Sequence, residues 1–172
     1  MTMCNCISTI EKSPHRRQNG FGSNYIRGNV TNTTTTPDGL QAQGWRPRSL
    51  PGFAGLVGPL WTRKEESGWN YGVLAGPEHL NPAGLVHGGL LMSLMDHALS
   101  AIAWEAVGRR ACVTVQMDTQ FLSGARAGDF LLARGQVTRA TSSLVFMNGM
   151  ASVGDKQILA ASALLKVLEG AP

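Results

Sequence analysis

The sequence predicts an α+β fold in which one long helix is wrapped by a curved antiparallel sheet of five to six strands. Three observations lead to this prediction. One long run of helix-forming residues spans 87–107. Alternating apolar and polar residues begin soon after it, and the strand-like runs that follow are joined by links too short for parallel crossovers.

The run from 87 to 107 is expected to be a core helix. Gly108 supplies a stop signal, and Arg109 and Arg110 carry the positive charge that suits a helix C-terminus. Its apolar residues cover most of the circumference: Leu90, Leu91, Leu94, Met95, Ala98, Ala101 and Ile102. A helix with so wide an apolar surface must be packed on several sides.

Before this helix, residues 69–77 predict a strand that ends at a Gly-Pro breaker, and 51–61 predict a short helix or a capping loop. After it, residues 113–122 alternate and predict a half-buried strand. Val113, Val115, Met117 and Phe121 point one way, and Thr114, Gln116, Asp118 and Gln120 point the other. Three further strand-like runs, 129–139, 143–153 and 157–168, complete an expected meander of four antiparallel strands.

The N-terminal part differs in composition from the rest. Residues 1–43 are polar and rich in helix and strand breakers, so we expect a disordered tail, followed by a single domain over 44–172. Residues 1–50 also carry the whole net charge of +4, with six basic and two acidic groups. The remainder is neutral and has no basic groove, which argues against nucleic-acid binding.

The three cysteines, Cys4, Cys6 and Cys112, have neither metal-ligand spacing nor the even number of a disulfide framework. We therefore expect a reducing compartment and no metal site. No run is long and apolar enough for a membrane span, and no apolar signal core occurs at the start. These features predict a soluble, cytoplasmic protein without a membrane partner.

A polar stripe runs along the predicted core helix. Gly89, Ser93, Asp96, His97 and Ser100 share one side of it, and no Lys, Glu or Arg occurs between 87 and 105. Solvated helix faces usually carry such charged residues. The stripe is therefore interpreted as the wall of a small polar pocket, although a plain water-facing side stays the alternative.

His87, Gly88 and Gly89 fall in the first turn of this helix, where backbone N–H groups lack partners. Two adjacent glycines destabilise a helix, so they need a reason. One reason is close packing against a strand. The other is an oxyanion hole, in which a carbonyl oxygen reaches the free N–H groups.

Asp96 is the candidate base or nucleophile beside that hole, but it lies about 11 Å further along the helix. One chain cannot easily bring both groups to one carbonyl. If the helices of two copies pack antiparallel, Gly88 of one meets Asp96 of the other, which predicts a functional homodimer. From the preceding loop, the Asn81 amide either holds a water or the substrate carbonyl, or stabilises a turn next to Pro82.

The segment LNPAGLVHGGLLMSLMDHALSAIAW resembles the hotdog-fold acyl-CoA thioesterases of the phenylacetate-pathway (PaaI) and 4-hydroxybenzoyl-CoA type. These share an Asn, then His-Gly-Gly, then an acid on the central helix. The resemblance covers roughly 45–169. It implies a hotdog fold, hydrolysis of an acyl-CoA thioester to free acid and coenzyme A, no cofactor or metal, and a homodimer or homotetramer.

The resemblance also implies residue roles. Asp96 would act as nucleophile or as the base that activates water, and the Gly88 N–H would polarise the carbonyl. Asn81 and His87 would position the substrate, and the Thr114 hydroxyl would hold the water or the acid. The candidate substrate-binding residues are Gly89 and, for the coenzyme A phosphates, Arg126, Arg139 and Ser142. Met92, Leu99 and Trp104 are candidates for the lining of the acyl pocket.

Two other functions stay open. One is a hotdog enoyl-CoA hydratase or dehydratase, which pairs a catalytic His with an acid in a different loop motif that His79 and His97 do not match. The other is a non-catalytic acyl-CoA-binding module. The sequence contains no Gly-x-Ser-x-Gly elbow, zinc helix, P-loop or dinucleotide fingerprint.

Overall fold

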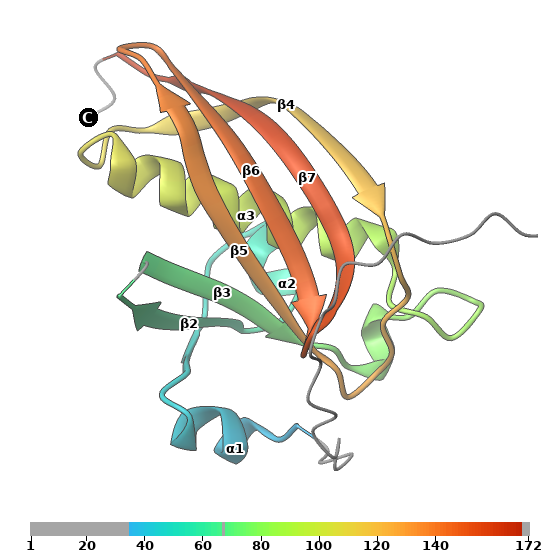
Figure 1. The fold of residues 1–172 in the computed structure, drawn as a ribbon. Coiled ribbons are helices and arrows are strands. Elements are labelled where there is room, and N and C mark those ends of the chain that lie inside the picture. Colours follow the sequence, from blue (N-terminus) through green and yellow to red (C-terminus); the bar gives the residue numbers. More distant parts are fainter. Residues whose placement is uncertain (1–34, 67, 170–172) are drawn as a thin grey trace, which may run out of the picture. The chain divides into compact units, whose positions relative to one another are not determined.

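The computed structural model describes residues 35–66 and 68–169, which form an α+β hotdog-like fold (Figure 1). The elements are α1 (Pro37–Ala42), β1 (Arg46–Arg48), α2 (Phe53–Leu56), β2 (Leu60–Glu65), β3 (Gly68–Leu74), the 3-10 helix η1 (Pro77–His79), α3 (Gly88–Ala106), β4 (Cys112–Phe121), β5 (Phe130–Ala140), β6 (Leu144–Val153) and β7 (Lys156–Val167). No helix in these two stretches is long and apolar enough to cross a membrane.

The described strands form one antiparallel sheet of seven, in the order β1-β2-β3-β5-β6-β7-β4, with α3 packed against one face. The predicted fold class is confirmed, and the sheet gains the short strands β1 and β2. The predicted meander is correct for β5, β6 and β7 but wrong for β4, which pairs with β7 at the sheet edge. The link 122–129 crosses three strand spacings, about 14 Å, and eight residues can span about 26 Å.

The sheet comes close to α3 because two glycines face each other across β5 and β6. Gly135 pairs with Gly149 in the register of these strands. A Cβ on Gly135 would lie 2.5 Å from Leu99 Cδ2, and one on Gly149 would lie 2.5 Å from Met95 Sδ. Leu99 and Met95 are fully buried in the core. The two glycines therefore form a shallow seat for the middle of the helix.

A second apolar cluster lies on the opposite face of the sheet and changes the predicted domain boundary. Leu40 of α1 packs there with Trp45 and Trp61, against the side chains of Leu74, Phe130 and Leu132. Leu40 is 1% exposed. The disordered tail predicted for 1–43 therefore does not reach residue 43. Its first 34 residues lie outside the described part of the chain.

Candidate active site

The first turn of α3 presents the backbone N–H of Gly88 without an acceptor. His87 caps the helix, and its Nδ1 accepts the Gly89 N–H at 2.9 Å. For the Gly88 N–H, residues 35–66 and 68–169 provide no hydrogen-bond acceptor. A Cβ on Gly88 would lie 3.0 Å from the Phe121 ring. The close-packing explanation of Gly88 is thus supported, and its N–H is also left unpaired.

The loop before α3 is fixed by Asn81. Its Oδ1 accepts the N–H groups of Ala83 at 2.9 Å and Leu85 at 3.2 Å. The His87 N–H donates to the His79 carbonyl at 2.8 Å, which ties the loop to η1. Of the two interpretations of Asn81, the structure supports the turn. The side chain sets the path of the chain into the helix and so positions Gly88.

Asp96 is held from the neighbouring strand. The Thr114 hydroxyl donates to Asp96 Oδ1 at 2.6 Å, and Ser100 Oγ lies 3.4 Å from the same Thr114 oxygen. The register between β4 and β7 shifts between Thr114 and Gln116, so a bulge at Val115 interrupts the regular alternation. The Thr114 hydroxyl therefore reaches the helix, and Val113 and Val115 are exposed.

This bulge corrects the predicted strand. The sequence placed Val113, Val115 and Phe121 together on the apolar side of a half-buried strand, whereas all three are more than 40% exposed in the chain described here. Strand β4 also has no neighbour on its outer edge within the described sheet. An exposed apolar edge strand favours pairing with another chain.

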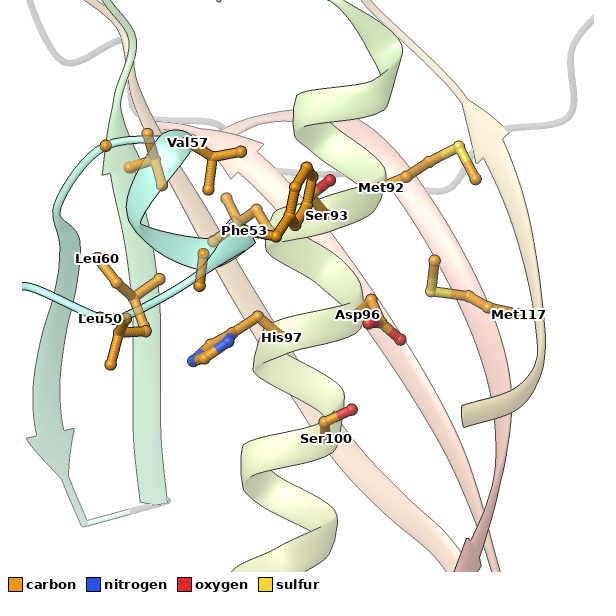
Figure 2. Close-up of a pocket in the computed structure, with 14 residues that line it drawn as sticks. Leu50, Phe53, Val57, Leu60, Met92, Ser93, Asp96, His97, Ser100 and Met117 are labelled. Carbon is orange, nitrogen blue, oxygen red and sulfur yellow. The ribbon is translucent and has the colours of Figure 1, made fainter. Parts of the chain in front are cut away.

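The Asp96 side chain lines an apolar cavity of about 450 Å³. The lining residues are Leu50, Phe53, Ala54, Val57, Gly58, Leu60, Val73, Met92, Ser93, Leu94, Asp96, His97, Ser100 and Met117. Figure 2 shows α2 covering one side of it and Met117 of β4 on the other. Asp96 points towards Met117, and His97 points towards Leu50 and Leu60.

Only one of the three predicted apolar lining residues lies in this cavity. Met92 lines it, whereas Leu99 is buried on the Gly135–Gly149 seat and Trp104 lies outside, with the Arg109 guanidinium 5.2 Å from its ring centre. The residues that the sequence missed come mainly from 50–60. Their apolar character was visible, but without a helix or strand period nothing indicated that they cover the site.

Burial shifts the pKa values of His97, which lines the cavity, and of Tyr71, which packs against it. Desolvation lowers the pKa of His97, and the nearby Asp96 opposes this shift only in part. The His97 ring meets Tyr71 edge to face, with ring centres 6.1 Å apart. Desolvation also raises the pKa of Tyr71 to about 12. The imidazole is therefore neutral at neutral pH, in contact with a neutral phenol.

A comparison with known proteins places the chain in a family. The model of the thioesterase superfamily matches residues 83–159. A curated protein of Pseudomonas aeruginosa, named "Putative esterase PA0474", is 31% identical over 124 residues, which cover 70% of this chain and 92% of that protein. The chain belongs to the thioesterase superfamily.

Solved structures share the fold of this thioesterase superfamily member. The BH2602 protein of Bacillus halodurans, solved with CoA, is 21% identical, with a TM-score of 0.62 over 78% of this chain and 89% of that one. The E. coli PaaI protein of the phenylacetic acid degradation operon is 20% identical, with a TM-score of 0.56 over 76% and 84%. Zebra fish thioesterase superfamily member 2 is 20% identical, with a TM-score of 0.63 over 69% and 88%.

In this thioesterase superfamily member, one chain does not bring all the predicted site residues together. Gly88 and Asp96 are eight residues apart on the continuous helix α3, which is about 12 Å along its axis. Arg126 precedes β5, whereas Arg139 and Ser142 lie at its other end. The strand between them is about 33 Å long. Arg126 therefore cannot meet the same phosphate as Arg139 and Ser142 of its own chain.

Proposed function

We propose that this thioesterase superfamily member hydrolyses an acyl-CoA thioester to a free acid and coenzyme A, in a site that two copies of the chain complete. The observation that carries the proposal is Asp96, held by the Thr114 hydroxyl at the wall of an apolar cavity. The cavity receives the acyl group. The BH2602 structure was solved with CoA, which supports coenzyme A as the thiol part of the substrate.

The second copy supplies the oxyanion hole. If Gly88 of each chain faces Asp96 of the other on antiparallel helices, the two-fold axis passes midway between them, at Met92. Met92 is 38% exposed although it is apolar and lies on the core helix. Val113 and Val115, on the free edge of β4, add exposed apolar surface. This face provides the dimer contact.

The chemistry then needs few groups. The N–H of the partner's Gly88 donates to the thioester oxygen and stabilises its negative charge in the transition state. As a base, Asp96 takes a proton from a water whose oxygen bonds to the carbonyl carbon. As a nucleophile, its oxygen bonds to that carbon, and water hydrolyses the resulting anhydride. In both routes the C–S bond breaks and coenzyme A leaves as the thiolate.

The test uses the purified full chain with a panel of straight-chain and aromatic acyl-CoAs and a dye that reports free thiol. Asp96→Asn keeps the shape of the side chain and removes the proton acceptor. We expect kcat/KM to fall at least about a thousandfold, because the variant lacks the group that starts the reaction.

Asp118→Asn is the matched control. This carboxylate lies on the same strand as Thr114, accepts a hydrogen bond from the Gln116 side chain and does not line the cavity around Asp96. Its variant should keep the wild-type rate. Wild-type protein that releases no thiol from any acyl-CoA, or Asp96→Asn with full turnover, would show the proposal to be wrong.

A further inference from the structure

His97 lies beside Asp96 on α3 but serves another part of the cavity. Adjacent positions on a helix point about 100° apart. Asp96 accordingly points towards β4, and the His97 ring points towards Leu50 and Leu60 under α2 (Figure 2). Both side chains line the same cavity. An acyl group with its carbonyl carbon at Asp96 would extend past α2 towards the imidazole.

The ring nitrogens of His97 have no hydrogen-bond partner in the described part of the chain, unlike those of the two histidines nearby. His79 Nδ1 accepts the Gly76 N–H at 2.8 Å, and His87 Nδ1 accepts the Gly89 N–H. The His97 ring packs edge to face with the Tyr71 ring. This contact leaves the ring nitrogens of His97 unpaired. A neutral imidazole offers one N–H donor and one acceptor nitrogen.

The other polar side chains of the cavity already have partners. Ser93 donates to the Gly89 carbonyl at 2.7 Å, Asp96 accepts from Thr114, and Ser100 lies within hydrogen-bond distance of Thr114. The walls on the side that His97 faces, Leu50 and Leu60, are apolar. Among the described side chains that line this part of the cavity, the imidazole is therefore the one whose polar atoms have no partner.

We propose that His97 is a specificity-determining residue, which hydrogen-bonds a hydroxyl or carbonyl group carried by the acyl chain several bonds away from the thioester. This inference rests on the proposed function and names the substrate class of the same site. The preferred acyl group has an apolar body that fills the space under α2 and one polar substituent that meets the imidazole. A purely hydrocarbon acyl group would cover the imidazole and leave its ring nitrogens unpaired.

The experiment starts from the acyl body that the wild-type enzyme hydrolyses fastest in the acyl-CoA panel. Pairs of thioesters are made that carry a hydroxyl or a methyl group at the same carbon, for successive carbons away from the carbonyl. At one position, wild-type kcat/KM should favour the hydroxyl member about tenfold or more, because burying an unpaired polar group costs binding energy.

His97→Phe keeps the ring shape and the packing on Tyr71 but removes both polar atoms. It should abolish the hydroxyl preference, which is read as the ratio of kcat/KM between the two members of each pair. His97→Gln, which restores a donor and an acceptor, should recover part of the preference. A change in folding alone would alter both members of a pair equally and leave their ratio unchanged.

Two results would overturn the inference while the proposed hydrolysis stands. One is a wild-type enzyme without preference at any carbon. The other is a preference that persists in His97→Phe, or in His97→Leu if the Phe variant fails to fold. Hydrolysis of no acyl-CoA at all would overturn both the function and the inference, so the two failures are distinguishable.

Discussion

At the scale of single residues, Thr114 determines where the Asp96 carboxylate lies. Its hydroxyl donates to Asp96 Oδ1 at 2.6 Å, and Ser100 Oγ lies 3.4 Å from the same hydroxyl. Thr114→Val keeps the shape and removes the donor. We expect kcat/KM to fall about 10- to 100-fold, since a hydrogen bond to a charged group contributes about 1.5–3 kcal/mol.

Thr114→Ser keeps the hydroxyl and should retain most of the activity, which separates the hydrogen bond from the packing of the methyl group. Steady-state kinetics on the best acyl-CoA measures both variants. Equal activities for the Val and Ser variants would show that the contact with Asp96 does not matter for turnover.

The buried position of His97 should make the free energy of unfolding depend on pH. Burial lowers its pKa in the folded chain below the ordinary value of 6.5, so the unfolded chain binds a proton more tightly. The free energy of unfolding should therefore fall as the pH drops below about 6.5, and this loss should level off once the pH is below the folded-state pKa. Urea unfolding of wild type and His97→Phe across this pH range measures the free energy of unfolding. The part of its pH dependence that comes from His97 should be absent in the variant.

At the scale of elements, the Gly135–Gly149 pair sets the distance between the sheet and α3. Gly135→Ala places a methyl group 2.5 Å from Leu99 Cδ2, in a fully buried site. We expect it to lower the free energy of unfolding by about 1–3 kcal/mol, as overpacking does. Chemical denaturation measures the change.

A double-mutant cycle provides the control. In a Leu99→Ala background the added methyl group has space, so Gly135→Ala should cost clearly less there than in the wild type. If the two costs are equal, contact with Leu99 is not the reason for the glycine.

The elements also show which features a sequence reveals. The helix predicted over 87–107 is α3, Gly88–Ala106, because its length and wide apolar surface are unambiguous. Strand β2 was missed because its residues, LWTRKE, do not alternate cleanly between apolar and polar. The bulge at Val115 could not be predicted from the sequence of β4, because it arises from the pairing of β4 with β7. Helix α1 was hidden because its single buried residue, Leu40, lies in a polar stretch.

The site was predictable to a similar extent. The stripe on α3 and, for Thr114, the family resemblance led to the residues that meet around Asp96. The cavity wall from 50–60 was not predictable, because these residues come together only when α2 folds over the helix. The role of Asn81 depended on a turn geometry that its sequence neighbours allowed but did not require.

At the scale of the whole molecule, the proposed site needs a donor and a carboxylate that one chain keeps about 12 Å apart. Gly88→Pro isolates the donor. Proline is well tolerated at the first position of a helix, and His87 already has the extended backbone (φ −64°, ψ 135°) that a following proline requires. Gly88→Ala adds a Cβ but keeps the N–H, and so controls for contact with Phe121.

Subunit mixing tests the shared site most directly. Gly88→Pro and Asp96→Asn should each be nearly inactive alone, whereas Gly88→Ala should stay active. When the two inactive variants are unfolded and refolded together, half of the dimers combine both chains, and each such dimer has one intact site. Activity should return to about a quarter of the wild-type value. If mass spectrometry shows mixed dimers but no activity returns, the two groups do not act across the dimer, and the central claim is contradicted.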